Sequence, residues 1–149
     1  MLPVTRVLCP TDFSDPSAVG FDIAAELSGH FGAEVLVVHV VSAMPPLQYG
    51  PNRAFQVPEY ETALHADAQH RLEGMVETLA QKGVKARTAV GHGDAGSEIV
   101  RIAGEERVDL IVIATHGTTG LEHVLFGSVA ERVVRLAHCP VLTVRSPRR

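Results

Sequence analysis

Short apolar runs, rich in Val, Ile and Leu, alternate along the chain with longer segments in which apolar residues recur every three or four positions. The runs lack the apolar–polar alternation of a strand with one solvated face, so they are typical of strands covered on both faces of a sheet. Five strands are therefore predicted, at residues 4–9, 35–41, 84–90, 108–114 and 141–145.

The segments between these runs have the spacing of amphipathic helices. In the second of them, for example, Leu64, Ala68 and Leu72 lie four residues apart and so share one face. The first is expected to begin with Ser14 or Asp15 as its N-cap. The four predicted helices cover residues 16–31, 59–82, 95–106 and 128–137.

Strands and helices in strict alternation imply right-handed crossovers and a doubly wound α/β fold. We expect a single domain over residues 1–149, with a five-stranded parallel sheet in the order 3-2-1-4-5 and helices on both faces, a Rossmann-like architecture. In this order the winding reverses between the first and the fourth strand. Ligands bind at such a switch point, beyond the carboxyl ends of the strands.

The segment after the fourth predicted strand has the features of a phosphate site. Gly117 lies in this loop, and Gly127 and Ser128 stand at the predicted start of the last helix. Backbone N–H groups at a helix N-terminus point toward an anion, and the helix dipole favours it. Ser128 and Glu131 also fit a capping box with Ser128 as N-cap, and the local pattern favours neither interpretation. His116 could donate to a phosphate, although a structural role at the end of the strand is favoured.

The segment at residues 10–14 follows the first strand and should meet this loop at the switch point. Asp12 is placed to accept a ribose hydroxyl or to help hold a metal ion on phosphates; alternatively, it is a turn residue at the entry to a helix. His39 is interpreted as a core histidine of a buried strand. His65 and His70 are five residues apart and therefore make a poor metal-binding pair on one helix face.

Composition excludes several classes of function. The chain is 46% hydrophobic and 20% charged with a formal net charge of −4, which is typical of a globular protein that binds neither nucleic acid nor membrane. No apolar span of ~20 residues and no signal-peptide pattern occurs, so a cytoplasmic location is expected. Cys9 and Cys139 are expected to lie at opposite ends of the strands as reduced thiols.

Two nucleotide motifs are absent. The chain has no P-loop pattern, and the dinucleotide fingerprint G-x-G-x-x-G does not follow the first strand. The proline-rich segment 42–58, about 17 residues long, leaves the carboxyl end of the second strand. It could cover the site or be a mobile surface loop.

The chain resembles the universal stress protein family over essentially its whole length. Nucleotide-binding members of that family carry G-x2-G-x9-G-[S/T] after the fourth strand, and the corresponding residues here are Ala114, Gly117, Gly127 and Ser128. The sequences PTDFS at 10–14, VHV at 38–40 and CPVLTV at 139–144 are also similar to signatures of the family.

The resemblance implies an adenine nucleotide at the switch point and a homodimer that pairs through the last strand, Val141 to Val144. An apolar sheet edge needs covering, which gives such pairing a physical reason. The implied site residues are Pro10, Thr11 and Asp12 at the ribose, Val40 and Ile113 at the base, and Gly117, Gly127, Ser128 and Val129 at the phosphates, with Ala114 and His116 beside them.

Two positions depart from the family pattern. Ala114 replaces the first glycine of the motif, and Thr118 stands where relatives often carry Arg or Lys. ATP remains the leading ligand, with Mg²⁺ on its phosphates, and AMP or ADP are the alternatives because the loop lacks a nearby cation.

The leading hypothesis is a cytoplasmic, homodimeric stress-response protein that binds an adenine nucleotide. A slow ATPase is an alternative, with Asp12 holding the metal ion and His116 orienting water. Efficient catalysis is not expected, since no Lys or Arg stands at the γ-phosphate position. A dimeric interaction module that binds no nucleotide is the other alternative.

Overall fold

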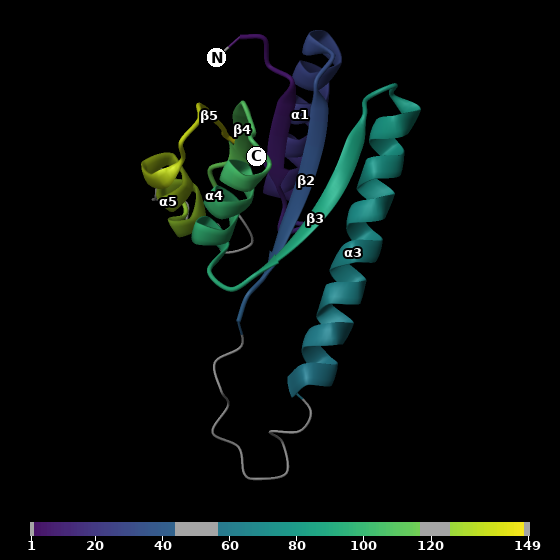
Figure 1. The fold of residues 1–149 in the computed structure, drawn as a ribbon, viewed down its shortest axis with the longest axis vertical. Coiled ribbons are helices and arrows are strands. Elements are labelled where there is room, and N and C mark those ends of the chain that lie inside the picture. Colours follow the sequence, from purple (N-terminus) through teal and green to yellow (C-terminus); the bar gives the residue numbers. More distant parts are fainter. Residues whose placement is uncertain (1, 44–56, 117–125, 148–149) are drawn as a thin grey trace.

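A parallel β-sheet forms the centre of the protein. The computed structural model describes residues 2–43, 57–116 and 126–147, and in this part of the chain the strands lie in the order β3-β2-β1-β4-β5 (Figure 1). Every neighbouring pair is parallel, so the predicted sheet and its order are confirmed. The strands are β1 (Arg6–Pro10), β2 (Glu34–Val41), β3 (Ala86–His92), β4 (Leu110–Ala114) and β5 (Val141–Val144).

Helices cover both faces of the sheet, as predicted. Apolar residues of α1 and α3 pack against one face, and those of α4 and α5 pack against the other. The helices of the described residues are α1 (Asp15–Phe31), α3 (Val57–Gln81), α4 (Ala95–Glu105) and α5 (Ser128–Leu136).

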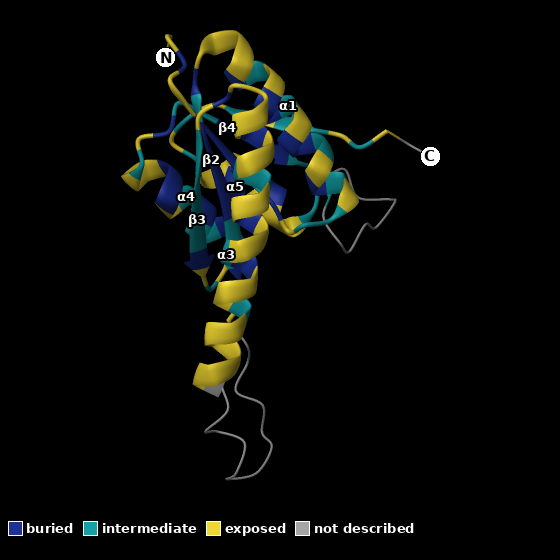
Figure 2. Cartoon of the chain, turned by 90° about the vertical axis from the view of Figure 1, so that its right-hand side faces the viewer, coloured by how far each residue is buried: buried dark blue, intermediate teal, exposed yellow. Residues whose placement is uncertain are grey.

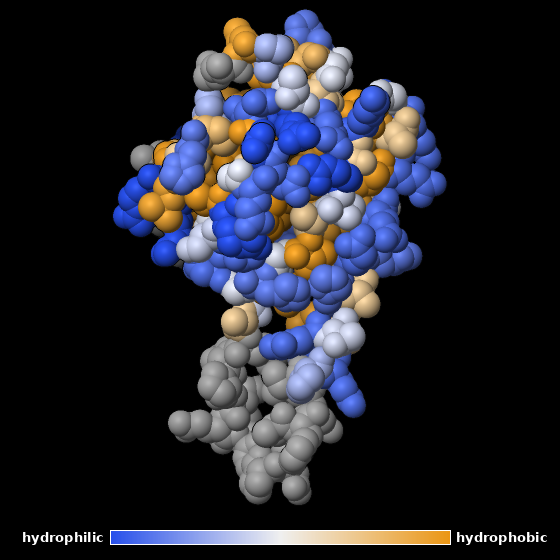
Figure 3. All heavy atoms as spheres, in the orientation of Figure 1, coloured by the Kyte–Doolittle hydropathy of each residue, from blue (hydrophilic) through white to orange (hydrophobic). Residues whose placement is uncertain are grey.

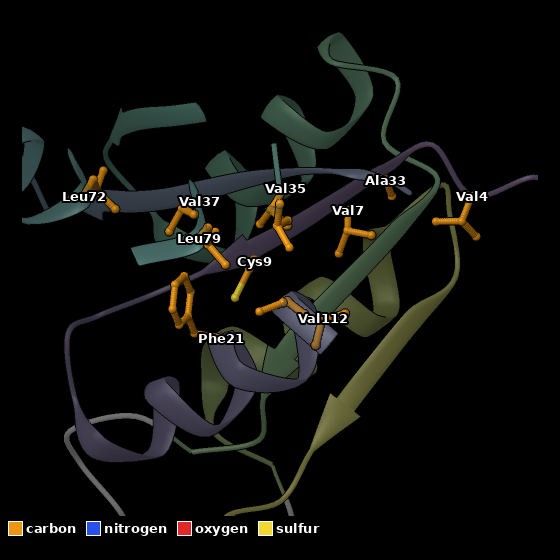
Figure 4. Packing of buried hydrophobic residues seen from close by; sticks show 13 residues of the cluster. Val4, Val7, Cys9, Phe21, Ala33, Val35, Val37, Leu72, Leu79 and Val112 are labelled. Carbon is orange, nitrogen blue, oxygen red and sulfur yellow. The ribbon is translucent and has the colours of Figure 1, made fainter. Parts of the chain in front are cut away.

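Successive residues of the central strands enter two separate cores. In β1, Val7 and Cys9 pack in the core beneath α1 and α3, together with Phe21 and Leu72 (Figure 4), whereas Leu8 packs in the core beneath α4 and α5. All three β1 residues are fully buried. This burial on both faces is the reason why the strands appear in the sequence as unalternated apolar runs.

Three of the observed strands begin two residues later than predicted. Val4, Val84 and Val108 continue the apolar pattern, yet they precede β1, β3 and β4 in the segments that enter the sheet. Each of these valines is buried against one of the two cores. Their side chains are apolar because of this packing, not because their backbone joins the sheet.

The helices bury only the side that faces the sheet. Figure 2 shows the exposed outer surface of α3 along most of its length and the buried strands behind it. Within the described residues, no helix combines the length and the apolar character that crossing a membrane requires.

Charged side chains at the amino-terminal end of the sheet pair with one another. The Arg87 guanidinium donates to Glu34 at 3.0 Å and to the carboxylate of Glu106, and the hydrogen bond from Arg87 lowers the pKa of Glu106. One oxygen of Asp109 accepts three hydrogen bonds, from the backbone N–H and hydroxyl of Thr5 at 2.8 Å each and from the Arg6 N–H at 3.0 Å. The backbone hydrogen bond from Thr5 lowers the pKa of Asp109. These groups therefore satisfy one another within the fold.

Both cysteines are free thiols. Cys9 is fully buried in β1, and burial raises its pKa to about 12, with a further contribution from the negative charge of Asp22. Cys139 is half-buried, and burial also raises its pKa, as does the charge of Asp109.

Candidate functional site

A cleft of about 350 Å³ opens at the carboxyl ends of the strands, where β1 and β4 lie side by side. The chain leaves β1 toward α1 on one face of the sheet and leaves β4 toward α5 on the other, so this is the predicted switch point. The walls come from the ends of β1, β2 and β4 and from the first turns of α4 and α5.

The structure brings ten of the eleven predicted site residues together around this cleft. They are Pro10, Thr11, Asp12, Val40, Ile113, Ala114, His116, Gly127, Ser128 and Val129. Gly117 lies outside the described residues, as do Thr118 and most of the proline-rich segment 42–58. The nucleotide-binding roles of these residues stay predictions.

A tight turn after β1 presents Asp12 to the cleft. Oδ1 of Asp12 accepts hydrogen bonds from the backbone N–H of Ser14 at 3.0 Å and from the Ser14 hydroxyl. Ser14 is the N-cap of α1 and accepts from the N–H of Ser17, which settles the choice between Ser14 and Asp15. Asp12 is therefore a turn residue at a helix entry and also an exposed carboxylate that lines the cleft.

Thr11 anchors the same turn to the sheet. Its N–H donates to the carbonyl of Val38 at 2.8 Å, and its buried hydroxyl lies 3.1 Å from the hydroxyl of Ser17. The hydroxyl also accepts from the N–H of Phe13 at 3.0 Å. The backbone on both sides of Asp12 is thus held by hydrogen bonds within the fold.

The start of α5 forms the opposite wall. Gly127 is the N-cap, with φ −67° and ψ 161°, and as a glycine it supplies no capping side chain to this helix terminus. The predicted capping box with Ser128 as N-cap is therefore wrong, because the Gly127 N–H closes onto the carbonyl of Thr115 at 2.6 Å and the helix starts at Ser128 itself. Ser128 and Val129 are exposed beside the cleft, so backbone donors of the first helical turn are available to an anion.

Gly127 is placed where a side chain would not fit without a shift. A Cβ on this residue would lie 3.2 Å from the Thr115 carbonyl oxygen and 3.9 Å from the Cα of His116. The absence of a side chain lets the start of α5 approach the end of β4 closely. That approach brings the helix terminus to the edge of the cleft.

Ala114 contacts α1 through the face of the sheet opposite α5. A Cβ on Gly20 of α1 would lie 3.3 Å from the Ala114 nitrogen and 3.8 Å from the Ala114 Cβ. Val112, two residues earlier in β4, packs in the core beneath α1 and α3, and Ala114 shares that face. Gly20 therefore lets α1 approach the backbone of Ala114 closely.

Thr115 closes the end of β4. It is buried; its N–H donates to the Val144 carbonyl of β5 at 2.9 Å, and its carbonyl accepts from Gly127. Its hydroxyl lies 3.0 Å from Nδ1 of His116, which is half-buried and lines the cleft. The position of His116 is compatible with both predicted roles: it lines the cleft, where a ligand would bind, and it contacts Thr115 at the end of β4.

His39 was interpreted as a core residue, but it is only half-buried and lines the cleft. Its Nδ1 lies 2.8 Å from the carbonyl oxygen of Thr11, and its ring packs on Phe13 with centroids 4.6 Å apart. Pro10 is the register partner of Val38, which places His39 level with Thr11. That register was the signal that could have identified His39.

Several other cleft residues escaped the sequence prediction. Ala95 and Ile99 come from α4, and Ser17 and Ser42 come from α1 and from the end of β2. The sequence analysis had assigned no ligand contact to α4. Its amphipathic pattern reports that Ile99 is buried but does not report that α4 begins beside the switch point.

The cleft offers few charges. Among the described residues that line it, Asp12 is the one carboxylate and His39 and His116 are the basic side chains, with no Lys or Arg. Elsewhere His65 pairs with His92 at 3.1 Å between ring nitrogens, not with His70. In the described ranges no three His, Cys, Asp or Glu side chains form a group that could hold a metal ion.

Comparison with known proteins identifies the family of this chain. A model of the universal stress protein family matches residues 3–145. The chain belongs to the universal stress protein family. A universal stress protein of Methanocaldococcus jannaschii is 36% identical over 144 residues, which is 97% of this chain and 84% of the relative.

Solved structures of universal stress proteins share the fold. UspA from Lactobacillus plantarum superposes with a TM-score of 0.83 and 25% identity, covering 95% of this chain and 98% of the other. A family protein from Arabidopsis thaliana with AMP bound has a TM-score of 0.69 and 22% identity, covering 96% and 92% of the two chains. One from Archaeoglobus fulgidus in complex with dAMP has a TM-score of 0.62 and 23% identity, covering 96% and 98%. The relatives from Arabidopsis thaliana and Archaeoglobus fulgidus thus hold adenine nucleotides in their structures.

Proposed function

We propose that this protein binds an adenine nucleotide in the cleft between β1 and β4 and acts as a homodimeric regulator in a cytoplasmic stress response. The observation that carries the proposal is the helix terminus of α5, which has a glycine as its N-cap and faces a cleft with Asp12 on its other side. A helix N-terminus suits a phosphate, and a carboxylate suits ribose hydroxyls. Nucleotide-bound relatives support the same assignment.

The proposed orientation follows from the two walls of the cleft. The base would lie between Val40 and Ile113, whose side chains belong to the core beneath α4 and α5 and offer apolar contacts. The ribose would lie at Asp12, and the phosphates at the backbone of Gly127 and Ser128. Apolar contacts supply affinity in such a pocket, while a few polar groups fix the orientation.

Charge bears on which nucleotide is preferred. ATP is the leading candidate, and the described cleft residues include no Lys or Arg to balance a triphosphate. Mg²⁺ would therefore be held mainly by the phosphates, with Asp12 as the carboxylate within the cleft. We expect Mg²⁺ to strengthen the binding of ATP more than the binding of AMP, because AMP carries less charge.

Titration calorimetry with ATP, ADP and AMP, each with and without Mg²⁺, tests the proposal. The expected result is saturable binding of at least one adenine nucleotide, with GTP weaker because the base site is apolar. A nucleotide carried through purification can be identified by mass spectrometry of the released ligand. Absence of binding by all three adenine nucleotides in the presence of Mg²⁺ would contradict the proposal and support a nucleotide-free interaction module.

The dimer is proposed to form through β5. This strand lies at the edge of the sheet, and Leu142 is 39% exposed. Val134 and Leu136 of α5 are exposed as well, and Figure 3 shows apolar surface on the side of the molecule that carries α5 and β5. An edge strand with apolar neighbours favours pairing with a second copy.

Sedimentation velocity of Leu142→Asp tests the dimer. We expect the wild-type chain to sediment as a dimer and the variant as a monomer, because a charge would be buried at the interface. Tyr60→Asp is the matched control, since Tyr60 is exposed on α3 at a distance from β5 in the fold. A wild-type monomer, or a dimer that both variants retain, would rule out pairing through β5.

A further inference from the structure

Three side chains from different parts of the fold stack behind the turn that carries Asp12. The ring of Phe13 packs on the ring of His39 from β2, with centroids 4.6 Å apart and an angle of 31° between the planes. The guanidinium of Arg71 from α3 also lies over the Phe13 ring, with its Cζ 4.0 Å from the ring centroid. We call Arg71, Phe13 and His39 the stack.

Phe13 has a backbone conformation that needs support. Its φ is +63°, in the left-handed region, where residues other than glycine are uncommon and bulky ones are strained. Contacts with the neighbouring structure must therefore hold it there. Its ring contacts His39 and Arg71 and also packs against the core beneath α1 and α3, and its N–H donates to the Thr11 hydroxyl.

His39 supports the other side of the turn. Its Nδ1 lies 2.8 Å from the carbonyl oxygen of Thr11, and a carbonyl oxygen can only accept, so Nδ1 carries the proton. This donor is present whether the ring is neutral or charged. The stack thus holds the carbonyl that precedes Asp12 through His39 and the residue that follows Asp12 through Phe13.

We infer that the stack positions Asp12 for the hydroxyls of a ribose and so determines how strongly the protein distinguishes ribose from a sugar without hydroxyls. This inference rests on the proposed function. Arg71 does not line the cleft and acts only through Phe13. Arg71 and His39 are positioning residues, and Asp12 is the group that contacts the sugar.

The first experiment compares two substitutions of His39. His39→Asn keeps an N–H donor near the position of Nδ1, whereas His39→Gln moves the donor to the position of Nε2. Calorimetry measures the affinity of each variant for AMP and for 2′,3′-dideoxy-AMP. We expect His39→Gln to bind AMP about tenfold more weakly and dideoxy-AMP within about twofold of wild type, and His39→Asn to recover most of the loss.

The second experiment acts from outside the cleft. Arg71→Ala should weaken AMP binding about threefold, again without a matching loss for dideoxy-AMP. Asp67→Asn is the matched control, because it removes the ion pair of Asp67 with Arg71 at 3.9 Å and leaves the stack intact. In an Asp12→Ala background, His39→Gln and Arg71→Ala should have no further effect on AMP affinity.

A third measurement needs no nucleotide. The amides of Phe13 and Ser14 donate to Thr11 and Asp12, so their hydrogen exchange should become faster in His39→Gln and Arg71→Ala than in wild type. Unchanged exchange in both variants would overturn the inference even if the protein bound no nucleotide.

The outcomes separate this inference from the proposed function. If the wild-type chain binds neither these two compounds nor ATP or ADP, the proposed function fails, and amide exchange alone then tests the stack. If it binds AMP more tightly than dideoxy-AMP and the ratio stays the same in both variants, the stack does not position Asp12. Equal losses for the two compounds, or losses that persist in the Asp12→Ala background, also overturn the inference.

Discussion

The two ends of the sheet contain polar groups in very different arrangements. At the amino-terminal end, Arg87 is paired with Glu34 and Glu106, and Asp109 accepts three hydrogen bonds from Thr5 and Arg6. At the carboxyl end, the described cleft residues include one carboxylate, two histidines and the start of a helix whose N-cap is a glycine.

The difference separates polar groups that stabilise the fold from polar groups that are available to bind a ligand. Paired charges at one end neutralise each other, so an added ligand would have to displace an existing partner. Backbone donors at the other end follow an N-cap glycine, which has no capping side chain, and are positioned by Gly127 and Thr115. Substitutions at the amino-terminal end should therefore change stability, and those at the carboxyl end should change binding.

The largest expected effect is at Gly127. Replacing it with Val should reduce nucleotide affinity roughly a hundredfold, or about 3 kcal/mol, because the side chain would collide with the Thr115 carbonyl and displace the donors of α5. Calorimetry measures the affinity. Gly104→Val is the control, since a Cβ there meets no atom within 4 Å and Gly104 lies in the last turn of α4, toward the amino-terminal end of the sheet. An unchanged affinity in Gly127→Val would show that the start of α5 is not where the nucleotide binds.

The next effect is on stability and depends on pH. The pKa of Asp109 is lower in the folded protein than its ordinary value of 3.8, chiefly because of the N–H of Thr5. Its contribution is therefore fully present above about pH 4 and is lost as the pH falls through the lowered pKa. Asp109→Asn should lower the free energy of unfolding by about 1–2 kcal/mol at pH 7.

Urea unfolding at pH 7 and near pH 2.5 measures this difference. The gap between the free energies of unfolding of wild type and Asp109→Asn should narrow at the lower pH, where a larger fraction of the wild-type carboxylate is protonated. Asp22→Asn serves as control, because Asp22 is exposed on α1. A gap of the same size at both pH values would mean that the charge of Asp109 does not stabilise the fold.

A smaller effect is expected at Arg87. Its side chain is 38% exposed, so Arg87→Met should lower the free energy of unfolding by about 1 kcal/mol, and less in high salt. Arg101→Met should lower it less than Arg87→Met does, because the ion pairs that the described residues give Arg101 are with Glu98 and Glu105 on its own helix. Nucleotide affinity should stay within about twofold of wild type in both variants. A larger loss of affinity in Arg87→Met would show that the ion pairs at the amino-terminal end affect binding at the carboxyl end.

The smallest effect concerns the two thiols, of which Cys9 lies near the carboxyl end of β1 and Cys139 lies just before β5. Cys9 is fully buried with a pKa of about 12, so iodoacetamide at pH 8 should leave it unmodified in the folded protein. Cys139 is half-buried and should be labelled first. Mass spectrometry of labelled peptides checks the order. Rapid labelling of Cys9 would show that the core beneath α1 and α3 opens readily.

Much of the fold could be predicted from the sequence because the periodicity of apolar residues reports burial directly. The strands and helices, their order and their two-sided packing follow from it. The strand starts were placed two residues early because Val4, Val84 and Val108 are buried outside the strands. Periodicity reports burial, whereas strand boundaries depend on backbone hydrogen bonds.

The site was predictable where residues adjoin a strand end in the chain, as Asp12 and Gly127 do. His39 and Ile99 could not be assigned to the cleft in this way, because their positions depend on the register of β1 with β2 and on the path of α4. The N-cap of α5 was misplaced by one residue for a similar reason. The hydrogen bond between Gly127 and Thr115, which closes that turn, joins segments that no local pattern connects.

Thr115 links the start of α5 to the edge of the sheet. Its carbonyl accepts from the N–H of Gly127, and its own N–H donates to the Val144 carbonyl of β5, so the backbone of one residue joins the helix terminus at the cleft to the last strand. Thermodynamic linkage is reciprocal. Any ligand that tightens the backbone of Thr115 and thereby favours pairing of β5 with a second copy must itself bind more tightly to the paired form, by the same factor.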